Sequence, residues 1–415
     1  MSDTLDFLEQ RHPLQREADL MSGLPQLIAR AQGAQGWARI LHGVAAGEIR
    51  DRAALAQLPL TRKSDLHGLQ ARQPPLGALN TTPHRQLRRL YVSPGPIFDP
   101  EGYGQDWWRF ARPMRALGLR AGDLIQNCFA YHFTPAAFMV EGAASKLGCA
   151  VIPAGIGQTE LQVQAMSALR PDAYVGTPSF LKIIIEKARE MGADIGTVQR
   201  ALLSAEALPP SLRQWFHDNG VPHVLQLYAS ADVGNIAYES LSDGRLNPGM
   251  ILDEDLILEI VRPGSGDPVA AGEVGEVVLT SFNPDYPLIR FATGDLSAVL
   301  EGVSPCGRTN TRIKGWMGRA DQVTKVRGMF VHPSQLAEVL KRHPQVLKAR
   351  LVVSGAMASD VMTLHCETQG APASVAEQVA DSLRDVTKLR GEVLLVAPGS
   401  LPNDGKVIED ARKYE

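Results

Sequence analysis

The sequence predicts an α/β protein: a large N-terminal domain with doubly wound, mostly parallel sheets and a small β subdomain, followed by a small α+β C-terminal domain. Three observations lead to this prediction. Between residues 122 and 180, strand-like apolar segments alternate with helix-like segments, which is typical of parallel strands joined by right-handed crossovers. Residues 255–282 alternate around a Gly-Asp turn, as antiparallel strands do. Beyond residue 319 the pattern restarts in a segment of about ninety residues, near the size of a small independent domain.

Length and composition are those of a globular protein. The 415 residues fit two or three domains, and 44% hydrophobic with 21% charged residues argues against disorder or a coiled coil. A formal net charge of −3 gives no electrostatic case for binding nucleic acid or an anionic membrane surface. Since no apolar run approaches the ~20 residues that span a bilayer, and the first residues are acidic and polar, we expect a cytoplasmic protein without a membrane partner.

The domains are expected in a simple order along the chain. Residues 1–90 carry apolar residues at a spacing of three and four, which predicts a helical approach segment. Residues 91–240 should form the parallel core and residues 241–318 the β subdomain, so that the large domain covers residues 1–318. Residues 319–321 would then connect it to the small domain, residues 322–415.

Candidate binding residues follow the predicted parallel strands, because such sheets bind ligands at the carboxyl ends of their strands. Tyr131 and His132 follow one strand, residues 155–159 the next, residues 177–179 the third, and Ser204–Glu206 another. A further strand opens into Tyr228, Ala229, Ser230, Ala231 and Asp232. A tyrosine at a strand end is usually core, but here it could also stack on a base while the aspartate holds a metal.

Three other segments have two readings from the residues alone. A short strand, a Pro-Gly-rich turn and a helix from residue 87 to residue 110 resemble a phosphate cradle, but Pro94, Pro96 and Pro100 remove backbone donors and favour a rigid turn. Arg290 and Asp295 flank a Thr-Gly pair, while Arg319 and Asp321 follow a glycine. These two charged clusters are either functional loops or solvated turns.

Taken together, these loops resemble the adenylate-forming superfamily, and within it the phenylacetate–coenzyme A ligase-like family. The resemblance extends from about Tyr91 to Arg412 and rests on pieces in the family order: VIPAGIGQTELQ, GTPSFL, SAEALPP, LYASADVG, GEVGEVVLTS, IRFATGDL, GRADQVTKVRGMFVHPSQLAEVL and GKVIEDAR. It implies an enzyme that joins a carboxylate to the α-phosphate of ATP and then transfers the acyl group to coenzyme A. ATP or AMP, Mg²⁺ and coenzyme A are the implied cofactors.

The resemblance also implies roles for individual residues. Lys406 would bridge the carboxylate and the α-phosphate, and Asp295 would accept both ribose hydroxyls. Tyr228 would lie against adenine, with Ala229 and Ser230 beside it. Ser204, Ala205 and Glu206 would line the other side of the base, and Arg319 would contact phosphate or ribose. Asp321 would be the hinge about which a mobile C-terminal domain swings between the two reactions. An acyl pocket is expected from Tyr131, His132, Ala154, Gly155 and Gly157.

The sequence departs from the family pattern at three places. The glycine-rich phosphate loop is degenerate, with Ser93, Gly95 and Pro100 as its remnants and Asp99 where a lysine is expected. Asp232 replaces a metal-binding glutamate and is one methylene shorter, which still permits Mg²⁺ binding. The positions of a structural zinc site read Ser240, Asn247, Ser304 and Cys306, and one thiol cannot make a tetrahedral site, so we predict no zinc.

The leading functional hypothesis is an ATP-dependent acyl–coenzyme A ligase that acts on a small carboxylic acid, with aromatic acids of the phenylacetate kind among the candidates. The alternative is a protein that binds a nucleotide or an acyl-adenylate and has lost turnover through its altered phosphate loop. Transfer to a carrier-protein thiol instead of coenzyme A is a third hypothesis. Relatives of this kind often form homodimers, and we expect the same here.

Overall fold

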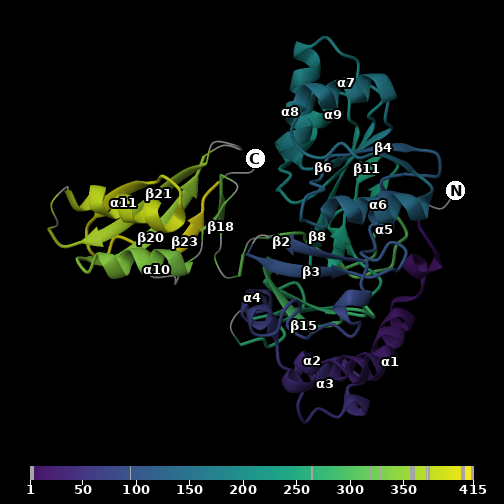
Figure 1. Ribbon diagram of the computed structural model, residues 1–415, viewed down its shortest axis with the longest axis horizontal. Coiled ribbons are helices and arrows are strands. Elements are labelled where there is room, and N and C mark those ends of the chain that lie inside the picture. Colours follow the sequence, from purple (N-terminus) through teal and green to yellow (C-terminus); the bar gives the residue numbers. More distant parts are fainter. Residues whose placement is uncertain are drawn as a thin grey trace. The chain divides into compact units, whose positions relative to one another are not determined.

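The structure is a computed structural model that describes residues 4–412 except 94, 263–264, 318, 321, 323, 328, 332, 356–359, 371, 373 and 403–406. The chain divides into two compact units, one of residues 1–208 and 212–317 and the other of residues 318–415 together with 209–211. Figure 1 shows the elements of each unit. No helix within the described ranges is both long and apolar enough to cross a membrane.

A nine-stranded mixed sheet is the centre of the first unit. Its first five strands are parallel, in the order β5–β4–β6–β7–β8, and four antiparallel strands, β9, β12, β17 and β16, continue it beyond β8. The bounds are β4 Leu124–Asn127, β5 Ala150–Ile152, β6 Ala173–Gly176, β7 Arg200–Leu203, β8 His223–Ser230, β9 Gly234–Tyr238, β12 Met250–Leu252, β16 Val299–Leu300 and β17 Arg312–Ile313. The short hairpin β10 (Leu241–Ser242) and β11 (Arg245–Leu246) lies between β9 and β12 in sequence.

Helices cover both faces of the parallel part (Figure 1). One face packs on α5 (Ala111–Ala116) and α6 (Ala136–Leu147) through Val175 and Leu202. The other face packs on α7 (Thr159–Leu169), α8 (Pro178–Glu190) and α9 (Pro210–Asp218) through Tyr174 and Leu203. Since neighbouring residues along a strand point to opposite faces, this alternation is what makes the sheet doubly wound. The fold class predicted from the sequence is confirmed.

A second sheet of the first unit joins segments far apart in the chain. Its order is β1–β15–β14–β13, with bounds β1 Thr61–Arg62, β13 Leu256–Val261, β14 Gly275–Ser281 and β15 Leu288–Ser297. Thr61 pairs in parallel with Phe291, so the N-terminal segment contributes a strand as well as helices. The helices of this segment are α1 Pro13–Gln32, α2 Gln35–Ile40, α3 Arg52–Ala56 and α4 Lys63–Arg72.

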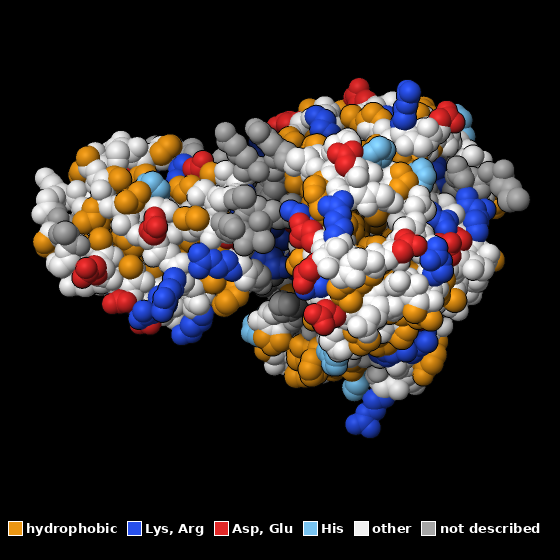
Figure 2. Space-filling model, turned by 90° about the horizontal axis from the view of Figure 1, so that it is seen from above, with side chains coloured by type: hydrophobic (Ala, Val, Ile, Leu, Met, Phe, Trp, Pro, Cys, Tyr) orange, Lys and Arg blue, Asp and Glu red, His pale blue; other side chains and the backbone are white. Residues whose placement is uncertain are grey.

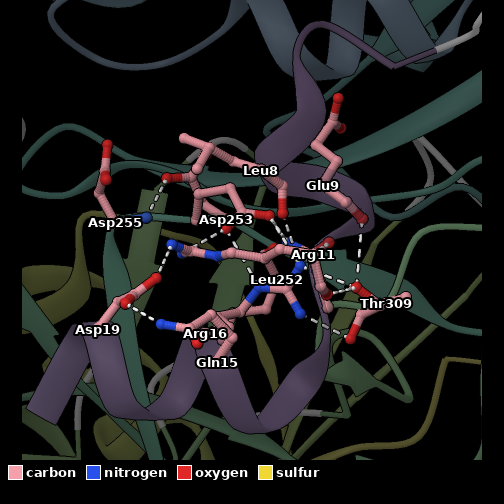
Figure 3. Close-up of polar contacts among 12 residues, drawn as sticks. Leu8, Glu9, Arg11, Gln15, Arg16, Asp19, Leu252, Asp253, Asp255 and Thr309 are labelled. Carbon is pink, nitrogen blue, oxygen red and sulfur yellow. Dashed lines mark hydrogen bonds and ion pairs between the residues drawn. The ribbon is translucent and has the colours of Figure 1, made fainter.

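Buried charges connect α1 to segments that are distant in the sequence. Arg16 donates to Glu254 Oε2 at 3.1 Å and to the backbone oxygens of Leu8 and Thr309, each at 2.8 Å. Figure 3 shows Arg11 and Arg16 reaching from this helix region toward Asp19, Leu8 and Thr309. Because a guanidinium carries five donors, one arginine can satisfy several buried oxygens at once.

The second unit is a small α+β domain with its own core. A four-stranded sheet has the order β22–β21–β20–β23, with bounds β20 Val346–Ser354, β21 Val361–Thr368, β22 Glu392–Val396 and β23 Ile408–Asp410. The unit also contains the hairpin β18 (Thr324–Val326) and β19 (Met329–Val331) and the helices α10 (Pro333–Arg342) and α11 (Ser374–Thr387). Leu351, Leu364 and Val379 are fully buried in its core.

Candidate active site

The two residues expected around the nucleoside lie in contact. Tyr228 of β8 donates from its hydroxyl to Asp295 Oδ2 at 2.8 Å, and Trp316 Nε1 donates to Asp295 Oδ1 at 3.1 Å. Both carboxylate oxygens of Asp295 therefore face hydrogen-bond donors, as they would if they accepted two ribose hydroxyls. Trp316 was not identified from the sequence, because nothing in its neighbourhood distinguishes a binding tryptophan from an exposed one.

The segment after β7 is held against β8. Ser204 is buried and donates to the carbonyl of Leu227 at 2.8 Å, while Glu206 accepts from the Ser179 hydroxyl at 2.9 Å. Ala205 between them is exposed and has a φ of 68°, so its backbone turns sharply at the strand end. Since β7 and β8 are neighbours, Ser204–Glu206 lie beside the strand that carries Tyr228 and Ala229.

Ser230 orients the loop after β8. Its hydroxyl accepts the Val233 N–H at 3.2 Å, and Asp232 between them points into a buried polar cluster. In this cluster the ammonium of Lys63 donates to Asp232 Oδ2 at 2.6 Å. Asp99 interacts electrostatically with Asp232 and accepts from the Ser93 hydroxyl.

The cluster shifts the pKa values of its members. Burial and the negative charge of Asp232 raise the pKa of Asp99 to about 7, against the opposing effects of Ser93 and Lys63. Burial would lower the pKa of Lys63, but the attraction of Asp232 outweighs it and raises that pKa, so the ammonium stays charged. A buried group whose pKa lies near neutrality, in contact with a residue expected to act on substrate, is typical of an active site.

The expected phosphate loop is a tight hairpin in the structure. β2 (Arg89–Ser93) pairs antiparallel with β3 (Ile97–Glu101), and Ser93 lies opposite Ile97. Pro100 stands inside β3 opposite Leu90, so Ser93, Gly95 and Pro100 do not share one loop. Residues 94–96 alone connect the strands, and Pro94 lies outside the described residues. A cradle built from a long run of backbone N–H groups therefore has no counterpart in this hairpin.

Tyr131 is the best-defined residue of the expected acyl pocket. Its hydroxyl accepts from Asn127 Nδ2 at 2.9 Å and donates to Glu141 Oε1 at 2.6 Å. Burial and the Glu141 carboxylate raise the pKa of Tyr131, so the phenol stays neutral. The ring lies next to Gly155, since a Cβ at that glycine would be 3.8 Å from Tyr131 Cδ2.

The other predicted pocket residues differ in their contacts and exposure. The carbonyls of Ala154 and Gly157 accept from Gln162 Nε2 at 3.2 and 3.3 Å, which rigidifies the glycine turn beside Tyr131. His132 is exposed. A cavity of about 520 Å³ opens on the Tyr131 side of the hairpin, with mixed polar and apolar walls that include Tyr131, Phe138, Glu141, Arg89 and Tyr103. Its volume suits a small organic ligand.

The positions that would hold zinc in relatives carry a hydrogen-bonded cluster. Asn247 Nδ2 donates to Ser240 Oγ at 3.0 Å, and Ser304 Oγ lies 3.1 Å from Cys306 Sγ. Burial alone would raise the pKa of Cys306, but hydrogen bonds from Ser240, Ser304 and Arg308 overcome it and lower that pKa. The donor set contains one thiol and satisfies itself, so it does not fit zinc.

Other predicted residues belong to the second unit. Lys406 and Asp321 lie outside the described residues, and Arg319 is half-buried in that unit. In the part of the chain that the structure describes, no three His, Cys, Asp or Glu side chains gather as a metal site. A magnesium ion can be held by one or two carboxylates together with phosphate oxygens, so Asp232 and Asp99 fit that ion.

Arg290 has a different place from the one expected. The segment Arg290–Asp295 is part of β15, and Arg290 is buried, with ion-pair contact to Glu259 at 3.0 Å. Its guanidinium also donates to the carbonyls of Ala56 and Leu58. The arginine therefore ties the strand to the N-terminal segment, and Asp295 is the residue of this pair that faces the candidate site.

Comparisons with known proteins find a matching family model and similar proteins. A family model described as "AMP-binding enzyme" matches residues 116–283. The phenylacetate-coenzyme A ligase of Escherichia coli (strain K12) is 29% identical over 392 residues, which cover 88% of this chain and 86% of that protein. The ligase of the same name from Thermus thermophilus is 28% identical over 315 residues, 74% of this chain and 70% of that protein.

The solved structures extend the likeness to the whole fold. A 2-hydroxyisobutyryl-CoA ligase, in complex with 2-HIB-AMP and CoA in the thioesterification state, has a TM-score of 0.78 at 23% identity and covers 98% of this chain and 92% of its own. A second protein, IdnL1, has a TM-score of 0.54 at 15% identity and covers 76% of this chain and 70% of its own.

Proposed function

Because this chain belongs to the phenylacetate–coenzyme A ligase-like family of adenylate-forming enzymes, we propose that it is an ATP-dependent acyl–coenzyme A ligase. In the first step a carboxylate oxygen bonds to the α-phosphorus of ATP and pyrophosphate leaves. In the second step the thiol of coenzyme A attacks the acyl carbon and AMP leaves. The observation that carries the proposal is the contact between Tyr228 and Asp295, which come from two different sheets and meet where a nucleoside would need both.

The residues of this chain have distinct tasks in the proposal. Tyr228 packs against adenine, and Asp295 accepts the ribose hydroxyls after exchanging its present donors. Lys406 and Arg319, on the second unit, supply cationic groups for the α-phosphate and the carboxylate, and Asp321 is the hinge. Since both reactants of the first step are anions, cationic groups have to offset their repulsion. Magnesium would supply further positive charge when bound with ATP.

The acid is proposed to be small, with aromatic acids of the phenylacetate kind as first candidates. The relatives named phenylacetate-coenzyme A ligase support this class. The ring of Tyr131 beside Gly155 offers a flat apolar wall, and Glu141 and Arg89 give the neighbouring cavity polar groups. A carrier-protein thiol is an alternative acceptor to coenzyme A, and a cytoplasmic homodimer is the expected form.

The tight hairpin favours a second candidate, a protein that binds a nucleotide or acyl-adenylate without turnover. A hairpin whose strands are joined by residues 94–96 offers few backbone donors for the β- and γ-phosphates. The adenosine side of the site, in contrast, keeps Tyr228 and Asp295 in contact. Such a protein would still bind AMP although it could no longer use ATP as a substrate.

Pyrophosphate release separates the two candidates. The full chain is incubated with ATP, Mg²⁺ and a panel of aromatic and short aliphatic acids, with and without coenzyme A. The ligase predicts release that depends on one class of acid and falls by about a hundredfold or more in Lys406→Ala. Lys341→Ala is the matched control, because Lys341 is an exposed lysine of the same unit, with 77% of its side chain accessible.

The absence of pyrophosphate release would also decide between the two candidates. If no acid produces pyrophosphate while AMP still raises the melting temperature, the chain is a binding protein and the ligase proposal fails. If release occurs but no acyl–coenzyme A accumulates, the adenylation half stands and the thiol acceptor is a different one.

A further inference from the structure

Asp99 of β3 and Asp232 of the loop after β8 form a buried pair of acids, which we call the carboxylate pair. Their exposed fractions are 1% and 4%. The two carboxyls interact electrostatically with each other, and each also interacts with Lys63. Oδ1 of Asp232 is buried and accepts no hydrogen bond from the residues that the structure describes. A buried carboxylate oxygen without a donor is costly, so this position calls for a proton or a cation.

Lys63 is the cation that the chain itself brings to the pair. It donates to Asp232 Oδ2 at 2.6 Å and also acts electrostatically on Asp99 and Asp295. Its side chain is 32% accessible, whereas that of Asp232 is 1% accessible. The side chain of Lys63 is therefore more accessible than the acid that it contacts.

Strand pairing explains why Lys63 reaches this place. Lys63 directly follows β1, and β1 runs parallel to β15 with Arg62 opposite Ala292. This register sets Lys63 alongside the residues that lead to Asp295. In the sequence the segment LPLTRKSDL has no feature that distinguishes it from the start of an ordinary helix.

When both carboxylates are ionised, the pair and the ammonium of Lys63 carry one net negative charge in a buried place. A divalent cation would match the pair completely. We propose that Asp99 and Asp232 together form a site for a hard divalent cation such as Mg²⁺, and that the cation displaces the ammonium of Lys63 from the pair. The released ammonium then faces the phosphates that arrive with the cation.

The family resemblance assigns no role to Asp99, whereas the proposed site uses it as a metal ligand. Where a phosphate loop would offer a lysine, the chain has a second carboxylate, and the missing positive charge comes from Lys63 on another element. Magnesium sites commonly combine one or two carboxylates with phosphate oxygens and waters, and the pair meets that requirement. The inference rests on the proposed function only in the use that it gives to the released ammonium.

Binding of Mn²⁺ to the full chain tests the site directly. The metal alone is the probe, followed by electron paramagnetic resonance and calorimetry at pH 8 without acid, ATP or coenzyme A. Asp99→Asn, which keeps the side-chain shape, is expected to weaken Mn²⁺ binding by about tenfold or more. Lys63→Met, which removes the competing ammonium, is expected to tighten it by on the order of tenfold.

Arg62→Met is the matched control for Lys63. Arg62 is the preceding residue, the last of β1, and its guanidinium pairs with Glu276 at 3.1 Å instead. The substitution Arg62→Met removes one positive charge nearby and leaves the carboxylate pair unchanged. The affinity for Mn²⁺ should therefore stay within about twofold of the wild-type value. Circular dichroism shows that each variant is folded before metal is added.

The opposite shifts of the two variants are the decisive readout, since a purely structural role of Lys63 would not tighten metal binding. Equal Mn²⁺ affinity in wild type and Asp99→Asn, or weaker binding in Lys63→Met, would overturn the proposal. Both results are independent of ligase turnover. A chain that binds Mn²⁺ as expected but releases no pyrophosphate keeps the metal site and loses the proposed function.

Discussion

At the scale of single residues, Asp295 is the proposed acceptor of the ribose hydroxyls. Its two oxygens now accept from Tyr228 and Trp316. A ribose would replace these donors with its two hydroxyls. Hydrogen bonds to a charged group contribute more than neutral ones, about 1.5–3 kcal/mol each. Removing the charge of this carboxylate should therefore weaken nucleotide binding.

We predict that Asp295→Asn weakens AMP binding by about ten- to a hundredfold, measured by calorimetry, because the amide accepts with one oxygen and loses the charge. Repeating the titration with 2′,3′-dideoxy-AMP gives the control, since the difference between wild type and variant should then disappear. A variant that weakens both ligands equally would mean that Asp295 supports the fold of the site and not the ribose. Trp316→Phe should leave AMP affinity unchanged or increase it.

The site residues differ in how far the sequence could reveal them. Tyr228, Asp232 and Ser204 follow predicted strands, and strand ends of a parallel sheet are the places to look for ligands. Lys63 and Trp316 could not be found in this way. Each reaches the site only through pairing or packing with a segment distant in the chain, and a single sequence does not show which distant segments meet.

At the scale of elements, β15 is joined to the N-terminal segment by one buried arginine. Arg290 is 3% exposed and spans Glu259, the carbonyls of Ala56 and Leu58, and the carbonyl of Gly266. The strand β1 follows directly after that segment and pairs with the same β15. Side-chain and backbone contacts thus hold the same two parts of the chain together.

We predict that Arg290→Ala lowers the free energy of unfolding by about 3–5 kcal/mol, because it leaves Glu259 buried without its partner. Urea unfolding followed by circular dichroism measures this as a lower midpoint. Arg170→Ala serves for comparison, since Arg170 and Asp194 form an exposed pair at 3.4 Å, and the expected change is below about 1 kcal/mol. Similar losses in both variants would show that the Glu259 contact carries no special weight.

The hairpin β2–β3 shows the limits of reading elements from residues. Three prolines between residues 94 and 100 suggested a turn along the whole segment. Proline is nevertheless tolerated in a two-stranded sheet where its missing N–H faces away from the partner, and Pro100 pairs with Leu90 in β3. The parallel part of the main sheet was predictable because its apolar strands and helices alternate regularly, whereas the hairpin has no such repeat.

At the scale of the whole molecule, the two units have separate cores, and the residues of the proposed site are divided between them. Tyr228, Asp295, Asp232 and Lys63 all belong to the first unit, and Lys406, Arg319 and Asp321 belong to the second. Figure 2 shows acidic and basic side chains interspersed on the visible face of the larger unit, in keeping with a net charge of −3.

We predict that a truncated chain of residues 1–317 folds and binds AMP within about threefold of the full-length affinity, because the hydrophobic clusters of the first unit and the residues proposed to contact the nucleoside lie within it. Calorimetry with AMP and thermal unfolding measure both properties. Pyrophosphate release should be lost together with Lys406. A truncated chain that folds but binds no AMP would show that the second unit contributes essential nucleotide contacts.

The pairing of β1 with β15 has a consequence for how the protein is made. Thr61 meets Phe291 and Arg16 meets Thr309, so the N-terminal helices find their sheet only after most of the first unit has left the ribosome. At about 5–20 residues per second, more than ten seconds of synthesis separate the two partners. Through that interval the apolar faces of the helices are without their final partners, which leaves this segment of the nascent chain open to non-native contacts.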